Sequence, residues 1–198
     1  ETSVRDAMQL MREKKIRRLP VMDDKGQLVG IVSEKDLLYA SPSPVTSLNV
    51  WEIHDLLYKL KVQKVMTTRV ITVDENQPVE DAARMMDDAN IGGLPVMRGK
   101  TLVGIITESD LFKAFLQFLG ARRSGVRVTA MIPNRKGTLA KITSAISGVG
   151  GDIVGLAFSE ASSGADWEIA LKVQDVPQAK LVETLRPVVD KILDVRET

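Results

Sequence analysis

Two short stretches of the chain hold the side chains whose types and spacing could do chemistry. The chain reads LVGIVSEKDL near its start and LVGIITESDL near its middle, so a hydroxyl stands three positions before an aspartate in both: Ser33 before Asp36, and Thr107 before Asp110. A hydroxyl can donate to a phosphate oxygen, and an ionised carboxylate can accept hydrogen bonds from both hydroxyls of a ribose. We therefore interpret each stretch as one corner of a nucleotide-binding site.

The same residues also admit a purely structural interpretation. A hydroxyl followed three positions later by an acid can form a capping box, which satisfies the first free N–H groups of a helix. A motif this short is weak evidence for a ligand when it stands alone. Gly30 and Gly104, however, each lie three residues before the hydroxyl, where a missing side chain lets a ligand or another backbone approach. The helix N-terminus that follows favours phosphate as well.

Both stretches belong to a longer internal repeat, which begins at Val4 and again at Val79. Apolar residues at helical spacing open each copy, so we expect an amphipathic helix there. Two apolar runs with β-branched residues follow, separated by turn residues, and they predict a hairpin whose first strand is LPVM in both copies. A second helix then begins after Ser33 or Thr107, which we expect to cap it.

Segments outside the repeat suggest how its copies are connected. Residues 65–78, VMTTRVITVDENQP, are strand-like and precede the second copy, whereas the first copy has no counterpart; we expect a strand to precede Glu1 in the natural protein. ASPSPVTSLN at 40–49 predicts a turn-rich linker, and 51–61 predicts a helical spacer. GARRSG at 120–125 predicts a second linker.

The last part of the chain follows a different pattern. From 126 to 198 the runs predict strand, helix, strand, strand, helix and strand, the last helix extending from Val176 to about Val189. That order predicts a two-layer α/β unit in which one sheet has two helices on one face. We expect three domains in all: 1–62 with the helical spacer, 63–119, and 126–198.

Composition restricts the classes of function. Lys and Arg number 27 against 26 Asp and Glu, so no broad basic field attracts nucleic acid. The chain has no cysteine, which excludes disulfides, thiolate metal sites and cysteine nucleophiles, and its one histidine, His54, cannot form a multi-histidine metal cluster. No apolar run approaches the roughly 20 residues that span a bilayer, so we expect a cytoplasmic protein that binds neither nucleic acid nor membrane.

The order of helix, LPV strand, GIV or GII strand and S/T-x-x-D helix start resembles the CBS domain. Two such domains in tandem, over residues 1 to about 118, resemble the paired regulatory unit called a Bateman module. The segment 126–198 resembles an ACT domain, so the resemblances together imply an α/β (α+β) fold: a CBS pair followed by a βαββαβ ferredoxin-like unit. This combination is similar to the AcuB-type proteins of acetoin utilisation.

The CBS resemblance implies roles for particular residues. In CBS domains the Thr or Ser of the motif contacts phosphate, its Asp contacts ribose, and adenine lies against the strand before the first helix and the LPV strand. This implies one site at Ser33 and Asp36 and a second at Thr107 and Asp110. In the second site the residues implied around adenine are Val70, Ile71 and Thr72 on one side, with Pro95 and Val96 opposite.

The two copies differ directly before the LPV strand. The first copy has Arg17 and Arg18 there, and the second has Gly92 and Gly93. Arginines can bind phosphate through forked hydrogen bonds, whereas glycines leave room for a backbone to approach. The alternative is that both arginines are solvated surface residues. In related CBS domains, basic residues at this position can reach phosphate in the cleft between the copies, and the resemblance implies the same for Arg17 and Arg18.

The ACT resemblance implies a second ligand site. Its signature turn corresponds to Asn134, Arg135 and Gly137, and ACT domains commonly bind amino acids at a subunit interface with this turn and the one after the first helix, here Gly151 and Asp152. The amides of the first turn could hold a carboxylate. The glycines of the second turn can equally be a helix C-cap.

We therefore expect a non-enzymatic regulatory protein that binds AMP or ATP as a regulatory ligand, with no catalytic cofactor and no metal. Alternatives are an S-adenosylmethionine sensor and a structural adaptor with degenerate pockets. A hydrolase or metal-assisted phosphatase using Asp36 and Asp110 is disfavoured, because neither an obvious catalytic base nor a metal cage is visible in the sequence around either aspartate. Exposed sheet edges and flat helical faces favour a homodimer or a higher even oligomer.

Overall fold

A computed structural model describes residues 1–42, 49–160 and 166–198, and it divides into two compact units, Glu1–Glu108 and Ser109–Thr198. Residues 43–48 of the linker expected at 40–49 lie outside the described residues. The division into three domains stays a prediction.

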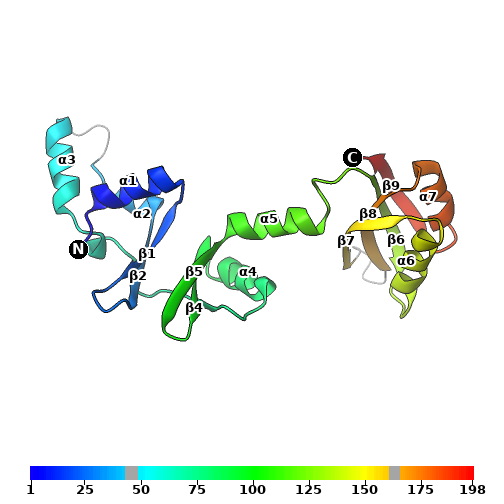
Figure 1. Cartoon of the computed structure of the whole chain (residues 1–198), viewed down its shortest axis with the longest axis horizontal. Helices are drawn as coiled ribbons and strands as arrows, with labels where there is room; N and C mark the ends of the chain where they lie inside the picture. Colours follow the sequence, from blue (N-terminus) through cyan, green and yellow to red (C-terminus); the bar gives the residue numbers. More distant parts are fainter. Residues whose placement is uncertain (43–48, 161–165) are drawn as a thin grey trace. The chain divides into compact units, whose positions relative to one another are not determined.

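The first copy of the repeat forms two helices and a hairpin in unit 1 (Figure 1). Its elements are α1 (Val4–Lys14), β1 (Arg18–Met22), β2 (Leu28–Ser33) and α2 (Glu34–Tyr39). Ser3 caps α1 by accepting from the N–H of Asp6 at 3.1 Å. α1 buries Val4, Ala7 and Met11 in a core that Leu37 of α2 completes. The predicted helices and hairpin are confirmed.

The predicted spacer is the helix α3 (Val50–Lys59). Asn49 caps it by accepting from the N–H of Glu52, whose carboxylate accepts from the N–H of Asn49 at 2.7 Å. Leu57 is buried in the core of the first copy, whereas His54 is exposed. The spacer is therefore part of the first copy's fold.

The second copy repeats the order of helix, hairpin and helix. Its elements are the 3-10 helix η1 (Val62–Lys64), β3 (Val73–Asp74), α4 (Val79–Asp88), β4 (Gly93–Arg98), β5 (Thr101–Thr107) and α5 (Glu108–Phe118). The sheet order is β3-β4-β5, in which β3 is parallel to β4 and β4 is antiparallel to β5. The stretch 65–78, predicted to be strand-like, forms a named strand only at β3. It turns after Asp74, where the N–H of Gln77 donates to the Asp74 carbonyl.

Unit 2 continues α5 and then forms a four-stranded antiparallel sheet with two helices. Its elements are β6 (Val126–Pro133), α6 (Thr138–Gly148), β7 (Asp152–Glu160), β8 (Asp166–Gln174), α7 (Gln178–Leu185) and β9 (Lys191–Glu197). The sheet order is β7-β8-β6-β9, so the predicted βαββαβ order is confirmed. Ile142 of α6 and Leu181 of α7 share one core with Leu171 of β8, which places both helices on the same face (Figure 1).

The helix α7 is shorter than predicted. It ends at Leu185 instead of near Val189. Pro187 follows two residues later, and proline lacks the N–H that the next turn would need. The N–H groups of Val188 and Val189 instead donate to the carbonyl of Leu185, which closes a tight turn before β9.

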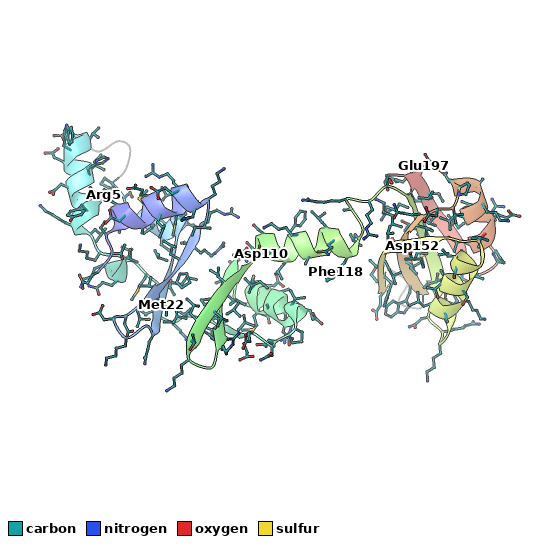
Figure 2. The ribbon with its side chains drawn as sticks, in the orientation of Figure 1. Arg5, Met22, Asp110, Phe118, Asp152 and Glu197 are labelled. Atoms are coloured by element: carbon teal, nitrogen blue, oxygen red, sulfur yellow. The ribbon has the colours of Figure 1, made fainter. Side chains whose placement is uncertain are left out.

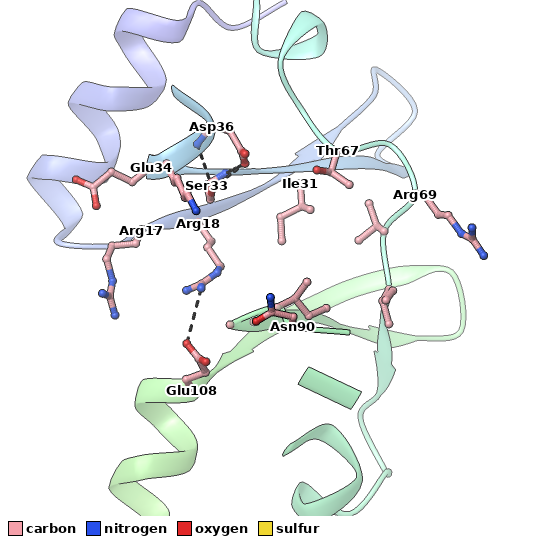
Figure 3. Close-up of a pocket in the computed structure, with 16 residues that line it drawn as sticks. Arg17, Arg18, Ile31, Ser33, Glu34, Asp36, Thr67, Arg69, Asn90 and Glu108 are labelled. Carbon is pink, nitrogen blue, oxygen red and sulfur yellow. Dashed lines mark hydrogen bonds and ion pairs between the residues drawn. The ribbon is translucent and has the colours of Figure 1, made fainter. Parts of the chain in front are cut away.

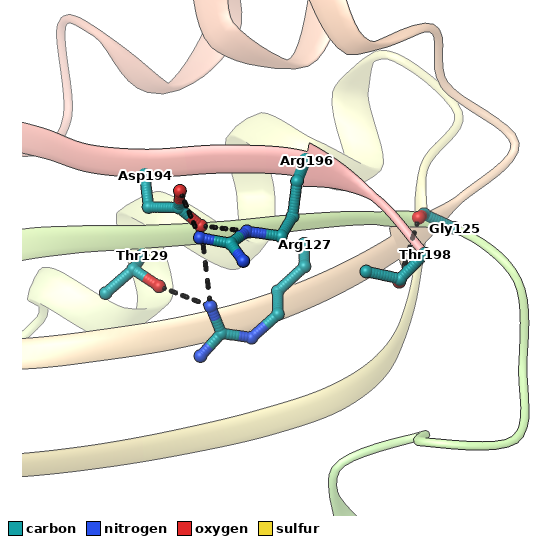
Figure 4. A network of polar contacts seen from close by, with 6 residues as sticks. All are labelled: Gly125, Arg127, Thr129, Asp194, Arg196 and Thr198. Atoms are coloured by element: carbon teal, nitrogen blue, oxygen red, sulfur yellow. Dashed lines mark hydrogen bonds and ion pairs between the residues drawn. The ribbon is translucent and has the colours of Figure 1, made fainter.

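The other face of this sheet holds a small charged network (Figure 4). Arg196 donates to both oxygens of Asp194, at 2.8 and 2.7 Å. Arg127 donates to Thr129 at 2.9 Å and lies 3.6 Å from Asp194. The hydrogen bonds from Arg196 lower the pKa of Asp194.

In the parts of the chain that the structure describes, each helix is too short or too polar to cross a bilayer.

Candidate functional site

A cavity of about 530 Å³ in unit 1 is lined by both copies of the repeat (Figure 3). This volume lies within the range of small-molecule sites, roughly 300 to 1,000 Å³. The lining residues are Arg17, Arg18, Ile31, Ser33, Glu34, Lys35, Asp36, Thr67, Arg69, Val70, Ile71, Asn90, Ile91, Gly92, Gly93 and Glu108. Eight of the residues predicted for nucleotide binding are among them.

Ser33 and Asp36 form one corner of the cavity. The Asp36 N–H donates to the Ser33 hydroxyl at 3.2 Å, while the Ser33 N–H and hydroxyl donate to Oδ2 of Asp36 at 2.8 and 2.7 Å. The predicted cap is therefore present at the start of α2. Within the described residues, Oδ1 of Asp36 accepts no hydrogen bond, so the carboxylate caps the helix with one oxygen and keeps the other for a further donor.

The segment that leads into the second copy forms the neighbouring wall. The Thr67 N–H donates to the Ile31 carbonyl at 2.9 Å, and the Ile31 N–H donates to the Thr67 carbonyl at 3.0 Å. Met66 packs against the core of the first copy, and a Cβ on Gly30 would overlap its sulfur. Gly30 therefore makes room for Met66, and the chain that continues from Thr67 brings Val70 and Ile71 to the cavity.

This arrangement differs from the pairing that the sequence predicted. Val70 and Ile71 were expected beside adenine in the site of Thr107 and Asp110, but they share a cavity with the Ser33 corner, because Thr67 pairs with β2 of the first copy. The other five predicted residues do not line this cavity: Thr72, Pro95, Val96, Thr107 and Asp110.

The structure places these residues within the second copy itself. Val96 lies in β4 and pairs in parallel with Val73. Pro95 is buried in the same strand, and Thr107 ends β5. Asp110 lies near the start of α5, where its carboxylate accepts from Lys113 at 3.2 Å (Figure 2). The Cβ position of Gly104 has open space around it, unlike that of Gly30.

Arg18 reaches from the first copy to the second. Its guanidinium lies 4.0 Å from the carboxylate of Glu108, and 23% of its side chain is exposed (Figure 3). A Cβ on Gly92 would overlap Arg18 and Glu108, and one on Gly93 would lie 3.0 Å from Cδ of Arg18. The two glycines therefore provide the space that the Arg18 side chain occupies, where sequence reasoning expected room for a backbone.

Sequence reasoning missed several charged and polar residues of the cavity. Glu34, Lys35 and Glu108 belong to the repeated motif itself, so the motif's remaining charges were the available signal. Asn90 has a left-handed φ of 50° after α4, as asparagine often does at a helix end.

The basic lining residues are Arg17, Arg18, Lys35 and Arg69, and the acidic ones are Glu34, Asp36 and Glu108. The cavity thus has a small excess of positive charge.

The residues implied by the ACT resemblance lie at two ends of one helix. Asn134 and Arg135 follow β6, and Gly137, with a φ of 85°, stands at the N-cap of α6. Gly151 and Asp152 follow the other end of α6, about 16 Å away for an 11-residue helix. A Cβ on Gly151 would overlap or press on Ile146, Val173 and Val176, so close packing explains that glycine. Within one chain the two turns do not meet.

Comparison with known proteins identifies the repeat. The family model for the CBS domain matches residues 1–43 and 62–117, half of the chain. A CBS domain-containing protein of Dictyostelium discoideum is 35% identical over 120 residues, which cover 60% of this chain and 83% of that protein. The chloroplastic CBSX2 of Arabidopsis thaliana is 36% identical over 135 residues, which cover 59% of this chain and 56% of that protein.

A solved structure gives the same result. The CBS domain of a CBS domain-containing membrane protein from Sphaerobacter thermophilus superposes with a TM-score of 0.52 at 29% identity, covering 57% of this chain and 77% of that one. A structure of CBSX2 in complex with AMP has a TM-score of 0.49 at 36% identity, covering 59% and 84%. The duplicated helix, hairpin and helix thus have relatives in both sequence and structure, and the chain belongs to the CBS domain family.

Proposed function

We propose that the chain is a regulatory protein that binds an adenine nucleotide, AMP first, in the cavity of unit 1. The observation that supports this most is the meeting of Asp36, Arg18 and Ile71 in one cavity, although they come from separate parts of the repeat. A carboxylate, a guanidinium and an apolar side chain are what a ribose, a phosphate and a base require.

In the proposed complex the base lies against Val70 and Ile71, of which Ile71 is 40% exposed and therefore accessible. The ribose hydroxyls donate to Oδ1 of Asp36. The phosphate accepts from Arg17 and Arg18, whose forked donors match its oxygens. The relative CBSX2, 36% identical in sequence, has been solved with AMP, and this supports AMP as the ligand.

The regulatory part of the proposal rests on α5. This helix begins with Glu108, which lines the cavity, and continues into unit 2 as far as Phe118. A ligand that favours one arrangement of the cavity would shift the population of that arrangement, and the continuous helix is the path to unit 2. The protein then acts by binding and not by catalysis.

For unit 2 we propose an ACT-type regulatory role, with an amino acid as its ligand and a homodimer or higher even oligomer as the assembly. Its βαββαβ order and antiparallel sheet support this. Because the turn at Asn134 and the turn at Gly151 lie at opposite ends of α6, a site that used both would need a second copy of the chain.

Isothermal titration calorimetry with AMP, ADP, ATP and S-adenosylmethionine tests the nucleotide proposal. Asp36→Asn keeps a cap acceptor but removes the charge, and should weaken AMP binding roughly tenfold or more. The repeat-equivalent variant Asp110→Asn is the control and should bind AMP like the wild type. Binding of S-adenosylmethionine alone would replace the nucleotide proposal with the alternative sensor, and no binding of any ligand would reject it.

A further inference from the structure

The contact between Arg18 and Glu108 is a loose ion pair within the cavity. The Nη2 and Oε2 atoms are 4.0 Å apart, which is longer than a hydrogen bond. Arg18 is mostly covered, with 23% of its side chain exposed, whereas 70% of the Glu108 side chain is exposed. Arg18 therefore has a fixed place, while Glu108 can leave it for water at little cost.

Glu34 is the counterpart of Glu108 in the first copy. A comparison of the two glutamates shows what distinguishes the Arg18–Glu108 ion pair. Both glutamates open a helix directly after the motif hydroxyl, and both line the cavity. Each N–H donates to the carbonyl of the residue at the same place in its copy: Glu34 to Arg17 at 2.9 Å, and Glu108 to Gly92 at 3.3 Å. Within the described residues, Glu34 forms no ion pair, so the two differ in their contact with Arg18.

We propose that Glu108 is an internal anionic competitor for Arg18 and thereby sets how strongly the cavity selects for phosphate, an inference that rests on the proposed nucleotide site. A phosphate oxygen forms charge-assisted hydrogen bonds with a guanidinium at about 2.7–2.9 Å, closer than the carboxylate of Glu108 lies. A bound phosphate therefore replaces Glu108 as the partner of Arg18, and the Glu108 carboxylate becomes hydrated by solvent.

The exchange has a cost for each phosphorylated ligand and none for an uncharged one. Before phosphate binds, Arg18 must lose its attraction to Glu108, and afterwards the carboxylate stays near a second negative group. Adenosine leaves the ion pair in place. Neutralising Glu108 should therefore strengthen the binding of AMP, and of ATP even more, without changing the binding of adenosine.

The requirement for Arg18 separates partner exchange from simple repulsion. If Glu108 acts through Arg18, its neutralisation has no effect once Arg18 is absent. If it acts only as a negative charge in the cavity, the effect persists without Arg18. A double-mutant cycle between the two residues distinguishes these cases.

The experiment is calorimetry of the full chain with adenosine, AMP and ATP on the wild type, Glu108→Gln, Arg18→Gln, the double variant and Glu34→Gln. Glu108→Gln should bind AMP roughly two- to fivefold more tightly, as expected for an exposed ion pair, with adenosine unchanged and Glu34→Gln giving a smaller change. The double variant should bind AMP like Arg18→Gln.

Two results would overturn the inference while leaving the nucleotide site intact: wild type and Glu108→Gln binding AMP equally, or the same gain from Glu108→Gln with and without Arg18. Absence of AMP binding by both the wild type and Glu108→Gln would reject the nucleotide site and this inference together. Unfolding temperatures without ligand confirm that every variant is folded.

Discussion

The backbones of Ile31 and Thr67 exchange two hydrogen bonds, of 2.9 and 3.0 Å, although Ile31 belongs to the first copy of the repeat and Thr67 leads into the second. This pairing holds the entry to the second copy against the hairpin of the first. It also turns Val70 and Ile71 toward the Ser33 corner. The cavity is thus formed by the way the two copies are joined.

Replacing Gly30 with alanine should destabilise unit 1, because the new Cβ would overlap Met66 and displace it from the core beside Thr67. The cost should be roughly 1–3 kcal/mol, as for other overpacked sites. Gly104→Ala, the same change in the second copy, meets open space and is the control. Urea unfolding of both variants measures the difference. Equal stability of the two variants would contradict the close contact with Met66.

Replacing Ile71 with alanine should weaken AMP and adenosine binding by the same factor, roughly three- to tenfold, because the lost contact is to the base. Stability should change little, since 40% of Ile71 is already exposed. Val103→Ala, at a side chain of similar exposure that does not line the cavity, is the control. An effect confined to AMP would place the phosphate, and not the base, beside Ile71.

Replacing Ile142 with alanine should destabilise unit 2 by about 2–5 kcal/mol, since this fully buried side chain packs α6 onto the sheet. AMP binding at the unit 1 cavity should be unchanged at temperatures where unit 2 remains folded. Leu193→Ala, at a side chain that is 44% exposed, should cost far less. Urea unfolding checks the stabilities, and calorimetry checks the binding.

The Asp194 network predicts a pH dependence of stability. The hydrogen bonds from Arg196 lower the pKa of Asp194 below its ordinary value of 3.8. A carboxyl with a lowered folded-state pKa contributes stability above its ordinary value, and the contribution is lost as the pH falls through the folded-state pKa. Asp194→Asn should therefore unfold at a slightly lower temperature than the wild type at pH 7 and at the same temperature at strongly acid pH. A difference that persists in acid would contradict an electrostatic origin.

The sequence predicted most of the helices and strands, because their signals are local. Apolar spacing gave α1 and α4, Ser33 gave the start of α2, and alternating runs gave the sheet of unit 2. The end of α7 differs from the prediction because the apolar pattern continues through Val188 and Val189, whereas Pro187 lacks the N–H that a further helical turn needs. Apolar periodicity and capping residues are enough to predict an element whose main contacts are with residues close to it in sequence.

The composition of the cavity depends on contacts between the copies, and these leave little local signal. Nothing in TTRVI indicates that Thr67 pairs with Ile31, so Val70 and Ile71 were assigned to the other motif. Arg18 was expected near phosphate from its charge, but its contact with Glu108 was not. Both contacts join residues far apart in the chain, and only the three-dimensional structure identifies such pairs.

The fit of Arg18 over Gly92 and Gly93 makes the two halves of the duplication non-equivalent. If both copies had the arginines, the second pair would occupy the space that Arg18 fills. If both had the glycines, that space would be empty, and the cavity would lose two of its four basic residues. If both copies were given one consensus sequence, each could still form its helices and hairpin, but the binding cavity between them would be disrupted. Arg18 and the glycine pair Gly92–Gly93 are complementary in size, so a change at one position is tolerated only with a compensating change at the other.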